Sequence, residues 1–116
     1  MKNKEIAYIK WFDSYQFKSK TILGTKGIYY VFEADYNIRD ESWYVTISTE
    51  DGVVLIQNKK LVPNIDLLEF CFNKLKPDCY LIPIVENDNI VDIDYEKMID
   101  ETVKLVHITD NEASNL

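Results

Sequence analysis

The sequence contains little of what most catalytic and metal sites are built from. Histidine occurs once, at His107, and cysteine twice, at Cys71 and Cys79, in 116 residues. A single histidine on an alternating strand, with no G-x-S-x-G motif near it, indicates a structural role. The two cysteines lack C-x-x-C spacing, so we expect reduced core thiols. The sequence therefore predicts no enzyme, no catalytic residue and no cofactor.

Glycine and proline are also scarce, at three residues each. Three glycines are too few to build a loop that cradles phosphates, and the composition leaves no room for a low-complexity linker. No apolar run approaches the roughly 18 residues of a membrane helix, and the N-terminus lacks an apolar segment of secretory length. We expect one domain over residues 1–108, a flexible tail over residues 109–116, and no membrane partner.

Positive charge is scarce in the second half of the chain. The net charge is −7 overall, and residues 61–116 contain four lysines against twelve Asp and Glu residues. Such a surface repels phosphates and anionic lipid, so stable binding to nucleic acid is not expected. The protein should remain in the cytoplasm where it is made, or enter an assembly formed there.

Five acidic residues lie close together in the second half, and they could in principle bind a hard cation: Glu86, Asp88, Asp92, Asp94 and Glu96. A calcium-binding loop of the EF-hand type also needs a glycine after its first aspartates, and none follows here. We therefore expect a solvated acidic loop and no metal.

Aromatic residues are abundant, with eight Tyr, five Phe and two Trp, and their alternation with polar residues predicts strands. Residues 27–36 alternate from Ile28 to Tyr36, with one face towards the core. Residues 43–48 and 53–57 alternate as well, and Asp51-Gly52 between them predicts a hairpin closed by a type I′ turn. Further strands are expected over residues 6–12, 16–23, 79–85, 90–94 and 103–108.

Residues 64–76 change to a helical period. Asn64 suits a helix N-cap and Asp66 the first turn, where the helix dipole favours a carboxylate. Apolar residues recur at spacings of three and four: Leu67, Leu68, Cys71, Phe72 and Leu75. The pattern predicts a helix around residues 65–75, whereas residues 95–101 suit a polar loop or a single helical turn. The fold class is then all-β, mainly an antiparallel barrel or curled sheet of about seven strands, with one short α-helix.

Aromatic side chains could also form a stacking platform for single-stranded nucleic acid, from Tyr29, Tyr30, Phe32, Trp43 and Tyr44. Such platforms come with a basic groove, and this region has only slight positive charge. Core packing and protein contacts are favoured, and an OB-like module that binds a small ligand or single-stranded nucleic acid stays the alternative.

Short motifs along residues 5–108 resemble one protein family. In order they are Gln16-Phe17, Tyr30-x-Phe32, Tyr36-Asn37 with Arg39 and Trp43, Asp51-Gly52, Leu61-Val62-Pro63, Leu67-Leu68 and Val103-x-Leu105. Together they resemble the baseplate plug proteins of phages and phage-like contractile tails, including those of cyanophages.

The resemblance implies a non-enzymatic structural component of a baseplate, which plugs or lines the central hub and tube through protein contacts. Implied partners are hub, tube and spike proteins and further copies of the chain, with a trimer suited to a threefold spike. The implied location is a virion or phage-tail-like particle assembled in the bacterial cytoplasm. Candidate contact residues are Tyr36, Arg39, Trp43 and Tyr44, because aromatic residues and arginine concentrate at interfaces. Each of them could instead pack within the domain.

Overall fold

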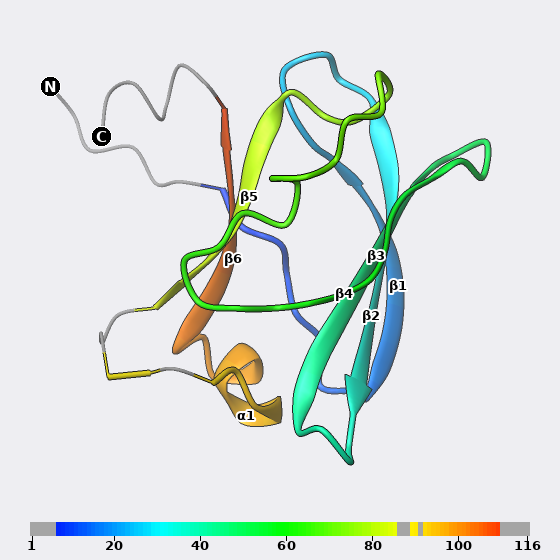
Figure 1. Ribbon diagram of the computed structural model, residues 1–116. Helices are drawn as coiled ribbons and strands as arrows, with labels where there is room; N and C mark the ends of the chain where they lie inside the picture. The colour runs from blue at the N-terminus through cyan, green and yellow to red at the C-terminus, as the bar shows by residue number, and fades with distance from the viewer. Residues whose placement is uncertain (1–6, 86–88, 91, 110–116) are drawn as a thin grey trace, which may run out of the picture.

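A computed structural model describes residues 7–85, 89–90 and 92–109, which form six strands and one short helix (Figure 1). The elements are β1 (Gln16–Ile22), β2 (Tyr29–Asn37), β3 (Ser42–Thr49), β4 (Val54–Lys60), β5 (Cys79–Val85), α1 (Tyr95–Ile99) and β6 (Val103–Thr109). None of the helices in this part of the chain is long and apolar enough to cross a membrane.

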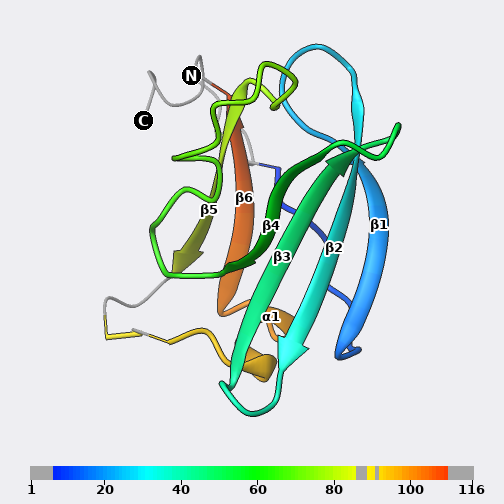
Figure 2. The same ribbon diagram turned by 45° about the vertical axis from the view of Figure 1, so that its right-hand side comes forward.

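Strands β1 to β4 form an antiparallel sheet in sequence order (Figure 2). The expected alternation is confirmed, since Phe32 and Ala34 of β2 and Val45 and Ile47 of β3 are fully buried while the residues between them are partly exposed. Antiparallel sheets with one wet face show this pattern. One face of the sheet therefore belongs to the core.

The β3–β4 hairpin is confirmed, but its predicted type I′ turn is wrong. Of the two central residues, Gly52 alone has a positive φ, of 95°. The Gly52 N–H donates to the Thr49 oxygen and the Thr49 N–H to the Val53 oxygen, at 3.0 and 2.9 Å. This is the three-residue loop in which a glycine with positive φ follows a tight turn.

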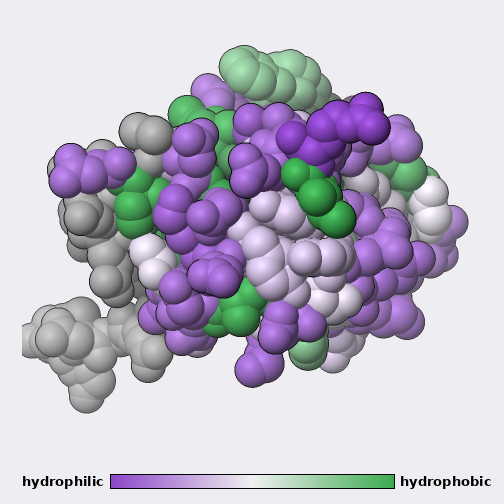
Figure 3. Space-filling model, turned by 90° about the horizontal axis from the view of Figure 1, so that it is seen from below, coloured by the Kyte–Doolittle hydropathy of each residue, from purple (hydrophilic) through white to green (hydrophobic). Residues whose placement is uncertain are grey.

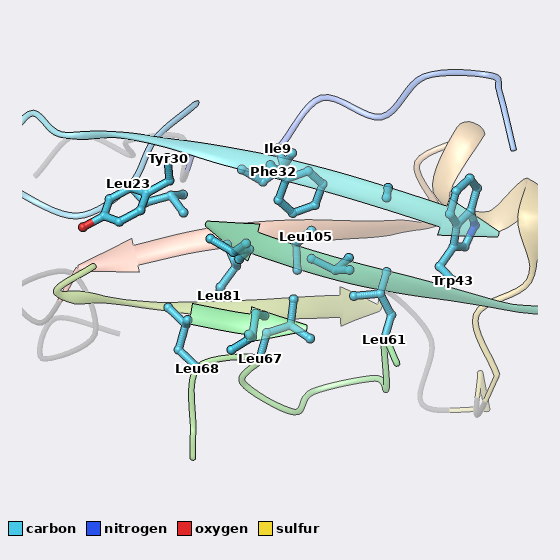
Figure 4. Packing of buried hydrophobic residues seen from close by; sticks show 14 of the residues in the cluster. Ile9, Leu23, Tyr30, Phe32, Trp43, Leu61, Leu67, Leu68, Leu81 and Leu105 are labelled. Atoms are coloured by element: carbon cyan, nitrogen blue, oxygen red, sulfur yellow. The ribbon is translucent and has the colours of Figure 1, made fainter. Parts of the chain in front are cut away.

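Strands β5 and β6 form a separate antiparallel pair, with Pro83 opposite Leu105. Proline lacks an N–H, and it fits here because β5 has no further strand on its outer side. Leu81 and Leu105 point from this pair towards the four-stranded sheet and meet Phe32 between the layers (Figure 4). The core thus lies between two sheets.

The all-β class with one short helix is confirmed, but the barrel and the count of about seven strands are wrong, because the described residues form six strands in two sheets that do not close on each other. After β4 the chain crosses to the outer edge of β5, where the Asn64 N–H donates to the Pro83 oxygen at 2.8 Å. The expected first strand over residues 6–12 is reduced to a single bridge between Tyr8 and Val106. Residues 89–90 and 92–94 are not in a strand either, and Val91 lies outside the described residues.

The predicted helix over residues 65–75 is also wrong; that segment consists of turns and irregular chain. Asn64 has a φ of 64° and does not cap a helix. The Leu67 N–H donates to the Leu81 oxygen, and the Leu81 N–H donates to Asp66 Oδ1, both at 2.8 Å. Pairing with β5 therefore takes the backbone groups that a helix would need, which is how tertiary context overrides a helical pattern.

The helix that does form is α1, so the expectation of a single helical turn over residues 95–101 is confirmed. Asp94 is its N-cap, and its Oδ1 accepts the Lys97 N–H at 3.2 Å. Of the expected tail, residues 110–116 lie outside the described residues, and Thr109 is the last residue of β6.

Candidate functional site

Aromatic rings gather where α1 packs against the end of the four-stranded sheet. Trp43 lies at their centre, with its ring centroid 5.2 Å from those of Trp11 and Tyr36 and 5.4 Å from that of Tyr95. Trp43 is fully buried and Tyr36 is partly buried. In this fold Trp43 packs within the chain, whereas part of Tyr36 remains accessible.

The other two candidate contact residues, Arg39 and Tyr44, lie at the β2–β3 turn. The Tyr44 hydroxyl donates to the Asp40 carboxylate, and Lys60 Nζ lies 3.7 Å from the same oxygen. The hydrogen bond from Tyr44 holds the pKa of the Asp40 carboxyl below its ordinary value and raises the pKa of the Tyr44 hydroxyl. Arg39 is exposed and forms no ion pair with a described residue. Contact of any of the four with another protein stays a prediction.

The surface around α1 is acidic. Two shallow hollows of about 290 and 410 Å³ flank the helix. Their lining carboxylates outnumber their lysines: Asp13, Asp40, Glu41, Asp92, Asp94, Glu96 and Asp100 against Lys60 and Lys97. Figure 3 looks onto this end, which we call the α1 end, and shows hydrophilic side chains around a paler central patch.

Of the five acidic residues expected in a solvated loop, the structure describes Asp92, Asp94 and Glu96. Within the described ranges, no three His, Cys, Asp or Glu side chains are placed to hold an ion. Asp94 caps α1, and Lys97 Nζ donates to the Asp92 backbone oxygen at 2.9 Å. Glu86 and Asp88 lie outside the described residues.

The opposite end of the molecule carries both apolar and charged side chains. There the β1–β2 connection, the β3–β4 turn and residues 74–76 surround a hollow of about 330 Å³. Four of its apolar lining residues are between 39% and 52% exposed, namely Ile28, Tyr29, Val53 and Leu75, and the fifth, Tyr30, is buried. Lysines and carboxylates form the rim, namely Lys26, Lys74, Lys76, Glu50 and Asp51. We call this the hairpin end.

Two phenylalanines near the hairpin end are the most exposed large apolar side chains that the structure describes. Phe70 is 72% exposed and Phe72 is 85% exposed. Phe72 was expected on the buried stripe of a helix, so sequence reasoning missed this surface. Exposed apolar side chains gathered in one place mark protein or ligand contacts, and residues 70–75 are therefore the strongest contact candidate in the fold.

His107, Cys71 and Cys79 are the side chains with the most potential reactivity, and each of them packs or bonds within the fold. His107 Nε2 accepts the Gly24 N–H at 3.0 Å, which joins β6 to the β1–β2 connection and fits the expected structural role. Cys71 and Cys79 are buried free thiols, as predicted, and burial raises the pKa of Cys79 to about 12. The Cys79 thiol therefore stays protonated near neutral pH.

The five aromatic residues considered as a base-stacking platform do not share a surface. Tyr30, Phe32 and Trp43 are buried between the sheets, whereas Tyr29 is exposed and Tyr44 is partly exposed. Neighbouring residues of a strand face opposite sides of a sheet, which separates the two sets. Core packing, the favoured interpretation, is confirmed for the first three.

Two antiparallel sheets that enclose one core, with both thiols buried and the histidine accepting a backbone hydrogen bond, define a small all-β domain. The family model described as cyanophage baseplate Pam3 plug gp18 matches residues 6–110. The chain belongs to this family of baseplate plug proteins, which confirms the resemblance seen in its motifs. Among curated proteins, none matches the chain.

Membership of this family makes the protein a structural component of a phage baseplate and places it in the virion. It also implies association with other baseplate proteins.

Proposed function

We propose that the protein plugs or lines the central hub and tube of the baseplate, without catalysis, by packing against hub, tube and spike proteins. It acts there as a homo-oligomer, and a trimer matches the symmetry of a threefold spike. The particle is a contractile phage tail or a phage-derived tail, assembled in the bacterial cytoplasm. Family membership and the surfaces described above support this role.

The observation that carries the proposal is the exposure of Phe70 and Phe72. Fully burying a phenylalanine side chain is worth about 1.5–3 kcal/mol, and a phenylalanine at an interface centre contributes large contact area. A subunit that functions inside an assembly can leave such residues for its neighbours to cover. Leu75, in the same segment of the chain, lines the hollow at the hairpin end.

The α1 end suits a position that faces the channel, on the side of the molecule opposite to the hairpin end. Its carboxylates give a negative surface, and negative charge repels the DNA that passes through a tail during ejection. The hairpin end then packs on neighbouring proteins while the α1 end lines the lumen.

The test is assembly of tail particles by a phage that carries a Phe70→Ser/Phe72→Ser double variant. We expect the purified variant to keep its melting temperature, because both side chains are exposed, and we expect plug protein to be depleted from purified particles. Glu69→Ser is the matched control, since it changes an exposed residue of the same segment without removing apolar area. Normal incorporation of the double variant contradicts this mode of packing.

A further inference from the structure

Three of the four outer sheet edges are covered or distorted by the chain itself. Residues 64–67 cover the edge of β5, through the hydrogen bonds given above. The segment that contains Ala7 and Ile9 covers the edge of β6: the Ile9 N–H donates to the Leu105 oxygen and the His107 N–H to the Ala7 oxygen, both at 2.9 Å. Covered edges cannot recruit another strand.

The edge of β4 is irregular. Its pairing with β3 shifts register between Val45 and Ile47, and Asn58 has a φ of 52°. Cys71 Sγ also donates to the Leu55 oxygen at 3.5 Å, which brings the following segment against this strand. Bulges and covering segments are the usual ways in which natural proteins close a sheet edge.

The edge of β1 differs from the other three. All seven residues of β1 pair with β2 in continuous register, and in Figure 2 no described segment runs along its outer side. The Tyr36 N–H donates to the Tyr15 oxygen at 2.7 Å. Backbone groups alternate in direction along a strand. The N–H and C=O groups of Phe17, Ser19 and Thr21 therefore point towards β2. Those of Gln16, Lys18, Lys20 and Ile22 point outward, away from the sheet.

We infer that this outer edge of β1 accepts an extended strand from a different protein of the baseplate, and that this strand carries carboxylates at two alternate positions. The inference deepens the proposed function and rests on it. Adding a strand to an open sheet edge supplies backbone hydrogen bonds, and the side chains at alternate positions supply specificity.

The positive charge of two lysines on β1 favours an acidic strand as the binding partner. Lys18 and Lys20 are exposed on the same face of β1, and Lys18 forms no ion pair with a described residue. The exposed Lys20 pairs with Glu50 at 3.1 Å, a type of pair that water and salt weaken. Carboxylates opposite both lysines stabilise an added strand.

A second copy of the chain fits this edge poorly. Antiparallel pairing of two β1 strands with full overlap is centred on Ser19 and sets Lys18 of each copy opposite Lys20 of the other. Like charges placed directly opposite destabilise a strand pair. The favoured occupant is therefore an acidic strand of another protein.

Amide hydrogen exchange, read residue by residue by NMR, tests the state of the edge in the purified chain. We expect fast exchange at Lys18 and Lys20 and slow exchange at Phe17, Ser19 and Thr21. If Lys18 and Lys20 exchange slowly even in dilute protein, the edge is already covered and the inference is overturned. If they become protected only as protein concentration rises, the occupant is a second copy, which also overturns it.

Incorporation into tail particles tests the role of the edge. Lys18→Pro removes an outward N–H and leaves the β2 pairing intact, so the variant should fold normally. We expect about tenfold less plug protein per particle, because the partner's carbonyl is left without a donor. Lys18→Arg keeps both the N–H and the charge and should incorporate as the wild type does.

The charge of the occupant is tested by Lys18→Glu/Lys20→Glu, which keeps every outward N–H. Loss of incorporation by this variant supports an acidic strand, and normal incorporation overturns that choice. If Lys18→Pro incorporates normally while the Phe70/Phe72 variant is excluded, the edge inference fails and the proposed function stands. Normal incorporation of both contradicts the proposed packing as well.

Discussion

Trp43 of β3 and Tyr95 of α1 stack on each other, with ring centroids 5.4 Å apart and ring planes inclined by 19°. Tyr95 also meets Tyr36 and Tyr15 at 5.3 and 4.8 Å. Aromatic pairs at these separations add to the free energy of burial. A helix of five residues is too short to be stable alone, so this stacking holds α1 on the end of the sheet.

Removing the Tyr95 ring should therefore release α1. We expect Tyr95→Ala to lower the free energy of unfolding by about 2–4 kcal/mol, measured by chemical denaturation. Tyr95→Phe keeps the ring and loses only the hydrogen bond that the hydroxyl donates to Asp13, at 2.6 Å, so its cost should be about 1 kcal/mol. Equal costs for both variants would show that the hydroxyl, and not the stacking, holds the helix.

Gly24 should tolerate no side chain. It has a φ of 84°, and a Cβ added there would collide with the Asp78 carboxylate. Gly27 has a similar φ of 70° but open space around it. In thermal denaturation we expect Gly27→Ala to cost about 1–2 kcal/mol from backbone strain alone, and Gly24→Ala to cost clearly more. Indistinguishable costs would mean that Asp78 moves aside freely.

Asp78 should make stability depend on pH in the acid range. Its carboxylate accepts hydrogen bonds from the Thr25 hydroxyl and, at 2.8 Å, from the Thr25 N–H, and these bonds lower its pKa. A carboxyl whose pKa is lower in the folded state stabilises the fold above its unfolded pKa of about 3.9, and the effect is lost as pH falls through the folded pKa.

The measurement is the melting temperature of the wild type and of Asp78→Asn between about pH 6 and pH 2. We expect the wild type to be more stable at the upper end and the difference to shrink as the solution becomes more acidic. A difference that stays constant over this range would assign the effect of the substitution to packing.

Asp66 should be essential for the segment that replaces the predicted helix. Its Oδ1 accepts the Leu81 N–H at 2.8 Å and the Leu68 N–H at 3.1 Å. Asp66→Ala leaves both donors without this partner and should lower the free energy of unfolding by about 1–3 kcal/mol. Asp66→Asn keeps an acceptor oxygen and should cost less. If Asp66→Ala raised the helix content in circular dichroism, the local helical preference of residues 65–75 would be the stronger force.

Local patterns were enough to predict most strands. Residues 27–36 and 43–48 alternate with period two, and that period is set by the geometry of a strand wherever it lies in the fold. Asp51-Gly52 likewise predicted the hairpin, although the turn type depended on how β4 pairs with β3. Residue type alone does not distinguish the buried Trp43 from the exposed Arg39, so the sequence could not show which candidate contact residues reach the surface.

Residues 64–75 show where prediction from the sequence fails. Their apolar spacing is helical, yet the backbone of Asn64 and Leu67 pairs with β5, which lies about fifteen residues further along the chain. This pairing is what leaves Phe70 and Phe72 exposed. A contact surface of this kind has no local signal, because it depends on which of several apolar residues the core leaves out.

The sequence by itself determined most of the strands, the scarcity of catalytic groups, the acidic second half and, through its motifs, the family. The tertiary structure decided that the strands form two open layers, that the helix among the described residues is α1, and that no described segment pairs with the outer edge of β1. The physical reason is range: side-chain alternation and turn chemistry act over a few neighbouring residues, whereas sheet edges and exposed apolar surfaces depend on hydrogen bonds between distant segments.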